Sequence, residues 1–275
     1  MATTNSTIEK IAPMFTELLI KKIECLKTDW QKPWITSLEQ GLPRNIRGTL
    51  YNGGNVLMLL FYTEFMKFTL PVFLTFNQAK EEDLSVCKGA RSFPVYYWFK
   101  FVVHKETKKT IKYEEYRKLP ATEQENYKVI PQMKYYNVFN IDQTDFAGKY
   151  PERYERMKKG EQPEDYSDRM IYEALDELVY LQNWYCPIKV QYSDSAYYSP
   201  SSDHIVCPQR EQFPQGAEYY GTLLHEMAHS TGSPQRLNRT FGCFFGDALY
   251  AREELVAELT AALCGAFFGY AAVPQ

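Results

Sequence analysis

Apolar residues recur at helical spacing near the N-terminus and at strand spacing further along the chain. From Ile8 to Leu26 they return every three or four positions, which predicts an amphipathic helix. A second, more apolar helix is predicted over residues 55–65. The run PVFLTFNQAKEEDL predicts a short strand that turns into a helix, and the aromatic-rich runs FPVYYWFKFVV and KYYNVFNIDQ predict two further strands.

Two charged segments interrupt this pattern. The first, HKETKKTIKYEEYRKLPATEQENYK, lies between the two aromatic-rich strands and is predicted to be a surface insertion or a long hairpin loop, because it lacks clear periodicity. The second, KYPERYERMKKGEQPEDYSDR, is the best candidate for a linker. The predicted organisation is one domain over residues 1–148, a linker over 149–168 and a second domain over 169–275.

The second half of the chain predicts a short sheet followed by two helices. A helix is expected over residues 170–183, strands in IKVQYS and AYYSPSSDHIVCP, and then a helix that carries the letters HEMAH. The last helix is predicted to begin near Asp247, a residue type that caps helix N-termini. A short antiparallel sheet followed by two helices is typical of a zincin-like domain, so the predicted fold class is α+β in two domains.

Composition indicates the class of protein and its cellular compartment. The chain has 45% hydrophobic and 24% charged residues, as a soluble globular protein does. Its six cysteines are scattered without a CxxC pair, and its N-terminus lacks the apolar core of a secretory signal, so we expect a reducing cytoplasm. The uncharged run over residues 259–273 is shorter than the roughly 18 residues that a membrane span needs, so a buried helix and no membrane contact are expected.

The two halves of the chain carry opposite net charge. Residues 1–140 contain 20 Lys and Arg against 14 Asp and Glu, a net charge of +6, whereas residues 141–275 contain 11 against 20, a net charge of −9. This division indicates two units with different partners, of which the basic one suits a polyanion. Two ordinary solvated surfaces explain the charge alone equally well.

The letters HEMAH form an HExxH motif. His225 and His229 are four residues apart and lie on one face of a helix, where both imidazoles can bind one ion, with Glu226 beside it as the candidate general base. A catalytic zinc site needs three protein ligands and an open position for water. Gln235 stands where metzincins have a third histidine, and a neutral amide binds zinc poorly. Gly232 is therefore interpreted as the end of the helix.

The third ligand is expected from the segment REELVAELTA. Glu254 and Glu258 are four residues apart on a predicted helix, so one can bind the metal while the other orients a ligand histidine through its second ring nitrogen. We assign Glu254 as the ligand and Glu258 as the orienting carboxylate, because an unpaired Glu258 would be costly in an apolar helix. Glu253 is the competing ligand. The simplest interpretation of His204 is a surface histidine.

This set of two histidines and one glutamate predicts metal-assisted hydrolysis of an amide. Zinc is the expected ion, although manganese or cobalt also suits these ligands. Zinc would make a water more acidic and polarise the scissile carbonyl, and Glu226 would carry a proton from that water to the leaving amine. The alternative is a purely structural metal, although such a site has no need of Glu226.

The ordered motifs of both halves resemble those of the ArdC-type antirestriction proteins of plasmids and other mobile elements. The similarity covers almost the whole chain and rests on WQKPW, LPRN, YNGGNVLML, FLTFNQA, KGA, YNVFNIDQ, AYYSPSSDHIVCP, YYGTLLHEMAHSTGSPQRLNR and YAREELVAEL. It implies an N-terminal domain that binds single-stranded DNA with little sequence preference and a zincin-like metallopeptidase domain that acts on an unknown protein substrate. It also implies protection of incoming DNA from restriction.

Aromatic and basic residues of the first half are candidates for DNA binding, because rings stack on bases and cations track phosphates. The candidate stacking residues are Trp34, Tyr51, Tyr97 and Phe99, and the candidate phosphate partners are Lys32, Arg44, Arg47, Lys88 and Arg91. Each aromatic residue also fits a hydrophobic core, because the alternation in VYYWFKF describes a half-buried strand.

Two features depart from the family. Its members continue past the last helix of the metal site, whereas this chain ends at GYAAVPQ, so the second domain is expected to be truncated or short, and the apolar Leu263, Phe267 and Phe268 to need a partner. The insertion between Lys105 and Lys134 is also longer and more charged than in the family. A peptidase that never meets DNA is the remaining interpretation of the chain.

Overall fold

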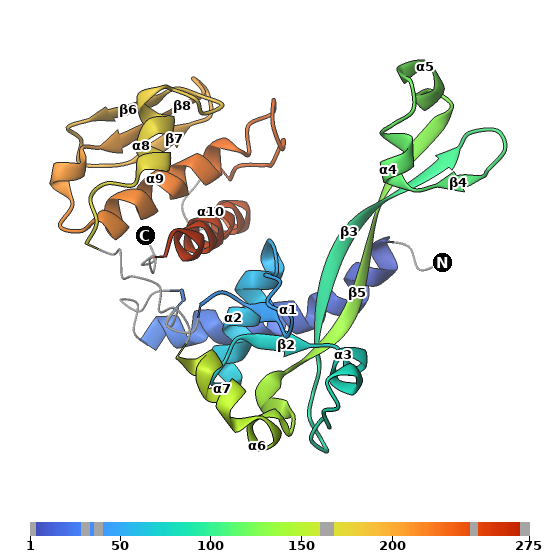
Figure 1. The fold of residues 1–275 in the computed structure, drawn as a ribbon. Helices are drawn as coiled ribbons and strands as arrows, with labels where there is room; N and C mark the ends of the chain where they lie inside the picture. Colours follow the sequence, from blue (N-terminus) through green and yellow to red (C-terminus); the bar gives the residue numbers. More distant parts are fainter. Residues whose placement is uncertain (1–3, 29–33, 36–40, 160–167, 243–246, 270–275) are drawn as a thin grey trace.

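The computed structural model describes residues 4–28, 34–35, 41–159, 168–242 and 247–269, which fold into two units with separate sheets (Figure 1). The α-helices are α1 (Thr4–Thr28), α2 (Gly54–Met66), α3 (Phe76–Glu81), α4 (Tyr113–Tyr116), α5 (Ala121–Gln124), α6 (Phe146–Lys149), α7 (Pro151–Lys158), α8 (Glu173–Tyr180), α9 (Gly216–Ser230) and α10 (Ala248–Phe268). The strands are β1 (Arg44–Asn45), β2 (Val72–Leu74), β3 (Phe93–His104), β4 (Thr110–Ile111), β5 (Tyr127–Asn140), β6 (Ile188–Gln191), β7 (Tyr197–Ser199) and β8 (His204–Pro208). The predicted fold class, α+β in two domains, is confirmed.

The N-terminal sheet has the strand order β1-β2-β5-β3-β4, and its two long strands leave the body of the domain as a ribbon (Figure 1). β3 and β5 pair antiparallel from Phe93 opposite Val138 to His104 opposite Tyr127. The predicted insertion forms the tip of this ribbon, with β4, α4 and α5, but residues 127–133 belong to β5, so the loop prediction is wrong there. A ribbon that is exposed on both faces lacks the alternation of a half-buried strand, which is why this part of β5 escaped detection.

α1 and α2 pack beside the base of the ribbon and confirm the two predicted helices. α2 buries a continuous run, residues 55–62, which explains its apolar sequence. Phe15 of α1 contacts Phe93 of β3 at 5.4 Å between ring centroids. The buried Lys22 of α1 pairs with Glu64 of α2 at 2.7 Å. These contacts hold the root of the ribbon on a firm helical base.

The C-terminal unit has a three-stranded sheet of order β6-β8-β7, on which α9 packs. β7 is antiparallel to β8 as predicted, but β6 runs parallel to β8, so the expectation of an antiparallel sheet is wrong at this edge. The chain crosses from β6 to the far edge before the β7–β8 hairpin, and this crossing sets the parallel direction. Asp247 caps α10 as predicted, because its Oδ1 accepts from the backbone N–H of Leu249 at 3.2 Å.

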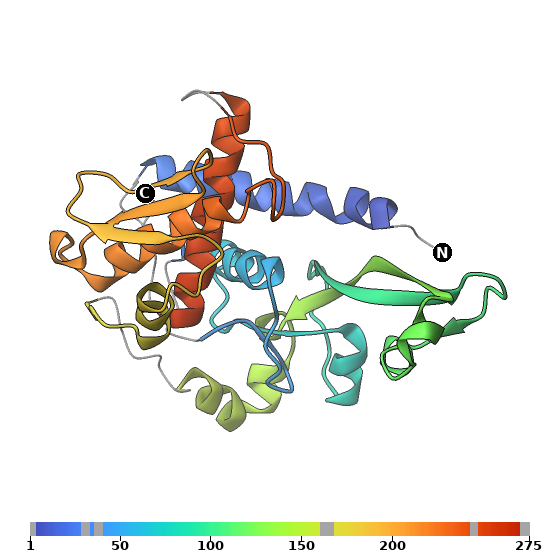
Figure 2. The ribbon, with the colours of Figure 1, turned by 90° about the horizontal axis from the view of Figure 1, so that it is seen from above.

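α10 lies between α9 and the N-terminal domain (Figures 1 and 2). One apolar core connects the two units and includes Phe61 of α2, Leu223 of α9 and Ala262 of α10. α7 lies inside the predicted linker range and packs Tyr154 and Met157 against a second, smaller core of the N-terminal domain. In the described part of the chain, no helix is both long and apolar enough to cross a membrane.

The apolar side of α10 is covered in large part by the chain itself. Leu263 and Phe268 pack against the main core, and Phe268 contacts Tyr172 at 5.1 Å between ring centroids. Phe267 is 47% exposed. Of the three residues that were expected to need a partner, two are therefore packed within the protein.

Candidate metal centre

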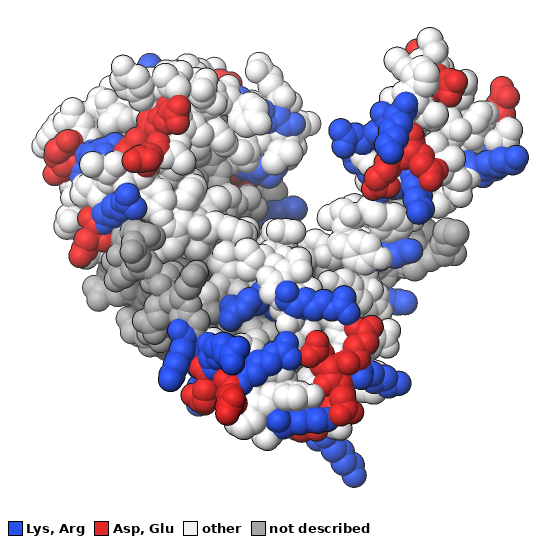
Figure 3. Space-filling view, viewed as in Figure 1, with Lys and Arg blue, Asp and Glu red and all other residues white. Residues whose placement is uncertain are grey.

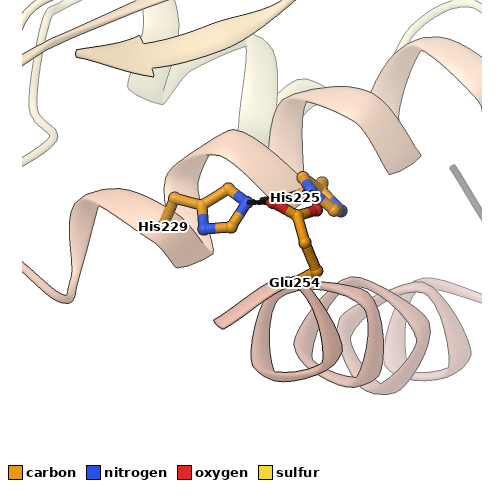
Figure 4. A group of neighbouring side chains, drawn as sticks. All are labelled: His225, His229 and Glu254. Atoms are coloured by element: carbon orange, nitrogen blue, oxygen red, sulfur yellow. Dashed lines mark hydrogen bonds and ion pairs between the residues drawn. The ribbon is translucent and has the colours of Figure 1, made fainter. Parts of the chain in front are cut away.

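α9 supplies both histidines of the HExxH motif. The helix is buried along its length, with Tyr219 and Leu223 in the core, and this burial fixes the directions of His225 and His229. The Nε2 atoms of the two histidines lie 3.0 Å apart, as the four-residue spacing on one helical face allows (Figure 4).

α10 faces α9 and supplies the third group of the cluster (Figure 4). The Glu254 carboxylate lies 3.4 Å from Nε2 of His225 and 3.5 Å from Nε2 of His229. Bonds of about 2.0–2.2 Å to a tetrahedral ion place ligand atoms roughly 3.3–3.5 Å apart, so the three groups fit a divalent metal with little rearrangement. Within the described ranges, this is the one group of His, Cys, Asp and Glu side chains that can hold a metal ion.

A further carboxylate faces the other ring nitrogen of each histidine. Oε1 of Glu258 lies 3.2 Å from Nδ1 of His225, which is an ion-pair distance at an angle outside hydrogen-bond geometry. Oε1 of Glu253 lies 3.3 Å from Nδ1 of His229. Arg239 holds the buried Glu253 by donating from Nε at 2.9 Å and from Nη2 at 2.7 Å. The structure thus places Glu253 as a histidine partner, and it adds Arg239, which the sequence analysis missed.

Burial shifts the pKa values of the groups in this cluster. It raises the pKa of Glu226 to about 7, against the opposing effects of His225 and of the Tyr198 backbone N–H. It lowers the pKa of His229, and the neighbouring His225 adds to this effect. Burial also acts to lower the pKa of His225, but Glu258 and the other nearby carboxylates outweigh it and the pKa is raised. A pKa of about 7 lets Glu226 both accept and release a proton near neutral pH.

A cavity of about 420 Å³ lies over the cluster. Its lining is Ala196, Tyr197, Tyr198, Pro200, His225, Glu226, His229, Phe241, Gly242, Tyr250, Glu253 and Glu254. β7 therefore forms one wall of the cavity and the start of α10 another. Arg236 stabilises the wall formed by β7. It pairs with Asp203 and donates from Nε to the carbonyl of Ser230 at 2.6 Å. Asp203 in turn accepts from the hydroxyl of Tyr198 at 2.8 Å, so this network ties the β7–β8 hairpin to the end of α9.

The segment after α9 contains Gly232 and Gln235, the last two positions of the metzincin pattern. Gln235 is exposed and outside the cavity lining, so it takes no part in the cluster. α9 ends at Ser230 with Thr231 as its C-cap, so Gly232 directly follows the helix as expected, although it lacks the left-handed backbone common for a glycine at this position. A Cβ on Gly232 would lie 2.7 Å from the Phe241 ring and 3.0 Å from Nη2 of Arg239. Glycine is needed here because it leaves the space through which Arg239 reaches Glu253.

The structure divides the candidate stacking residues into two pairs. Trp34 and Tyr51 are 6% and 9% exposed and belong to the core, so neither ring is available to a base. Tyr97 and Phe99 lie on one face of the ribbon at 6.0 Å between ring centroids, and Tyr136 lies 6.0 Å from Tyr97. Of the four candidate stacking residues, the accessible pair is therefore the one on the ribbon.

The candidate phosphate partners lie at the base of the N-terminal domain. Lys88 and Arg91 are exposed in the segment before β3, Arg47 pairs with Glu81 at 2.5 Å, and Arg44 is half-buried. Lys32 is outside the described residues. The structure adds two lysines on the ribbon that the sequence analysis missed. They are Lys134, whose Nζ lies 4.7 Å from the Phe99 ring centroid, and Lys100, 4.3 Å from that of Tyr113.

Comparison with known proteins matches each half of the chain to a known domain family. Residues 9–139 match the N-terminal domain of the anti-restriction factor ArdC, and residues 173–275 match a zincin-like metallopeptidase domain. The fold and the cluster thus define a zincin-like domain that follows an ArdC N-terminal domain. Crystal structures of the antirestriction ArdC protein from the R388 plasmid, metal-free and Mn(II)-bound, match with TM-scores of 0.59 and 0.58 at 28% and 27% identity, over 95% of this chain and 82% of each of those. The chain belongs to the ArdC-type antirestriction proteins.

Curated relatives show the same two-domain similarity. Two Escherichia coli proteins named DNA primase TraC are 29% and 30% identical over 263 and 261 residues, 90% of this chain in each case. The chain spans 22% and 16% of the lengths of these two relatives. The uncharacterized protein y4eC of Sinorhizobium fredii is 28% identical over 94% of this chain and 78% of its own length. The similarity to each relative therefore extends through both domains.

Proposed function

We propose that the protein is a DNA-binding zinc peptidase in which His225, His229 and Glu254 hold the metal. The close approach of the ligand groups carries this proposal: the two Nε2 atoms lie 3.0 Å apart, and each lies within 3.5 Å of one oxygen of Glu254, beside a cavity that Glu226 also lines. Zinc is the expected ion, and the same mixed nitrogen and oxygen set suits manganese or cobalt. The similar R388 ArdC protein has a Mn(II)-bound structure, which supports the binding of a divalent ion.

Each residue around the metal is proposed to have a separate role in amide hydrolysis. The bound ion supplies a more acidic water and a polarised carbonyl. Glu226 accepts a proton at its carboxylate and returns it to the leaving amine, a task that suits its pKa of about 7. Glu258 and Glu253 orient the rings of His225 and His229 through their second nitrogens.

The substrate is proposed to be an extended peptide segment of a protein. In the described residues β7 pairs on one side only, with β8, and its residues Tyr197 and Tyr198 line the cavity. A strand edge binds an extended peptide through main-chain hydrogen bonds, with little demand on its sequence. The exposed Tyr197, which lines the cavity, offers an apolar surface to such a segment.

The N-terminal domain is proposed to bind single-stranded DNA with little sequence preference, as part of the protection of incoming DNA from restriction. Tyr97, Phe99 and Tyr136 provide rings on one face of the ribbon, and Lys134 lies beside them. Lys and Arg side chains gather near the tip of the ribbon and over the base of the domain, with Asp and Glu among them, and the surface is hollowed between the ribbon and the second domain (Figure 3). Stacking rings interleaved with cations suit bases and phosphates of any sequence.

The variant Glu226→Gln tests both parts of the proposal. It is expected to slow proteolysis of an unfolded protein by about 10²–10⁴-fold, because it removes the general base. Its affinity for a labelled single-stranded oligonucleotide is expected to equal that of the wild type. Undiminished proteolysis would disprove the role of Glu226, and lost DNA binding would contradict the separation into two modules.

A structural metal is the second candidate, because the cluster joins α9 to α10 at the boundary with the N-terminal domain. A structural metal predicts that chelation lowers the melting temperature while no proteolysis is detectable in the wild type. A third possibility is a peptidase that does not bind DNA. Titration with an oligonucleotide at several salt concentrations distinguishes it from the two DNA-binding proteins, because DNA binding weakens steeply with salt.

A further inference from the structure

The two histidines of the metal centre are anchored by different domains. His229 faces Glu253, which Arg239 of the same domain holds. His225 faces Glu258, whose Oε2 accepts a hydrogen bond from Nε1 of Trp34 at 3.1 Å. Trp34 precedes Glu258 by 224 residues and belongs to the N-terminal part of the chain. One histidine partner is therefore held from outside the zincin-like domain.

Packing in the N-terminal domain fixes the indole of Trp34. The side chain is 6% exposed and stacks on Phe61 of α2 at 6.3 Å between ring centroids, with an interplanar angle of 29°. Phe61 is itself buried, and so is Ile35 next along the chain. Because packed aromatic rings move only when their neighbours repack, the indole N–H has a defined direction.

Glu258 needs such a donor. Its side chain is 13% exposed and lies in the apolar part of α10, where a carboxylate is stable only if its oxygens are hydrogen-bonded. Oε2 accepts from Trp34, and Oε1 lies 3.2 Å from Nδ1 of His225. The indole thereby selects the carboxylate orientation that places Oε1 against the histidine ring.

We propose that Trp34 is a positioning residue of the metal centre, which acts through Glu258 to set the orientation and basicity of His225. The inference rests on the metal centre proposed above. Carboxylate partners of ligand histidines control metal affinity, and a residue that holds the carboxylate shares that control. The metal centre is therefore completed only when the N-terminal domain lies against α10.

Titration of the metal-free full-length chain with Co(II), followed by the visible absorption of the bound ion, tests the proposal. Glu258→Gln is expected to weaken Co(II) binding by about 10–100-fold. Trp34→Phe keeps a ring against Phe61 but removes the N–H, and it is expected to weaken binding by about tenfold and to alter the absorption band. Because Trp34 acts through Glu258, the double variant is expected to bind as weakly as Glu258→Gln alone.

Trp184→Phe is the matched control. The indole of Trp184 donates to Oγ of Ser230 at 2.9 Å, at the end of α9, and does not contact a histidine partner. Its loss is expected to leave Co(II) affinity unchanged, with thermal unfolding used to confirm that every variant is folded. Wild-type affinity in Trp34→Phe, or additive losses in the double variant, would overturn the inference. A wild type that binds no Co(II) would instead overturn the proposed metal centre.

A measurement on the unmutated chain covers the case in which Trp34→Phe does not fold. The indole N–H resonance of Trp34 is expected to shift when zinc is added, because Glu258 joins the indole to His225. The resonance of Trp98, which is 57% exposed on the ribbon, serves as the reference and is expected to stay in place. A Trp34 resonance that does not respond to zinc contradicts the proposal.

Discussion

The metal centre and the ribbon differ in how far their functional side chains are buried and held by partners. In the metal centre, His225, His229 and Glu253 are buried, and each faces a charged or polar partner within 3.5 Å. On the ribbon, Tyr97 and Trp98 are 45% and 57% exposed on two paired strands. Chemistry at a metal needs fixed ligands, whereas binding a flexible strand of any sequence needs accessible rings and cations. The contrast predicts large, structural effects of substitutions in the first region and small, additive effects in the second.

The largest effect is expected from Arg239→Met. This change leaves the buried Glu253 without its bidentate partner, and breaking a buried ion pair costs about 3–5 kcal/mol. Chemical unfolding of the metal-free protein measures the loss. Arg153→Met breaks the more exposed pair with Glu82 in the N-terminal domain and is expected to cost less than about 1 kcal/mol. Equal losses of unfolding free energy in the two variants would contradict the proposed difference between the buried metal centre and the exposed surface of the N-terminal domain.

Glu226→Gln is expected to stabilise the metal-free protein at high pH. The folded-state pKa of Glu226 is raised from 4.5 to about 7, so the folded protein holds a proton that the unfolded chain releases, and stability falls as the pH rises through this window. Above pH 7 the buried charge costs about 3 kcal/mol, which glutamine avoids. The advantage in free energy of unfolding is therefore expected at pH 8 and should vanish near pH 5. Glu211→Gln changes an exposed glutamate and is the control. If Glu226→Gln were no more stable than the wild type at pH 8, the raised pKa of Glu226 would be disproved.

Tyr97→Ala is expected to weaken single-stranded DNA binding by about 1–3 kcal/mol, because one stacking ring is lost. Metal content and thermal stability should not change, since the ring is on the exposed ribbon. Tyr180→Ala removes an exposed ring of the second domain, 85% accessible, and should leave the affinity unchanged. Equal effects of the two substitutions in fluorescence anisotropy would show that the ribbon is not the binding surface.

The smallest effect is expected from Lys134→Ala. Removal of one phosphate contact lowers the slope of log affinity against log salt by about 0.7 for a single strand. The same titration with Lys158→Ala, in α7, provides a cation control outside the ribbon. An unchanged slope for Lys134→Ala would place the phosphates elsewhere on the domain.

Local spacing explains which parts were predictable from the sequence. The helix α1 follows from apolar periodicity, α2 from a continuous apolar run and α10 from the Asp247 cap. His225, Glu226 and His229 are likewise neighbours on one helix, and Glu254 stood out as a carboxylate in the next helix. These features depend on residues close in sequence, so a single chain carries enough information to propose them.

Contacts over long sequence distances were not predictable. Arg239 reaches Glu253 through space that Gly232 leaves open, and no local pattern signals such an approach. Trp34 looked like a stacking residue because its aromatic character is the same whether it meets a base or a core. Only the fold shows that its N–H is directed at Glu258.

The central claim is that His225, His229 and Glu254 together hold a divalent ion, and metal content tests it most directly. Wild type and Glu254→Ala are purified in parallel, exposed to zinc, dialysed and analysed by elemental mass spectrometry, with Glu211→Ala as a control for loss of an exposed glutamate. The account predicts one bound zinc per chain in the wild type and in the control, and little in Glu254→Ala, because two histidines alone bind zinc weakly. Full occupancy in Glu254→Ala would contradict the assignment of the third ligand.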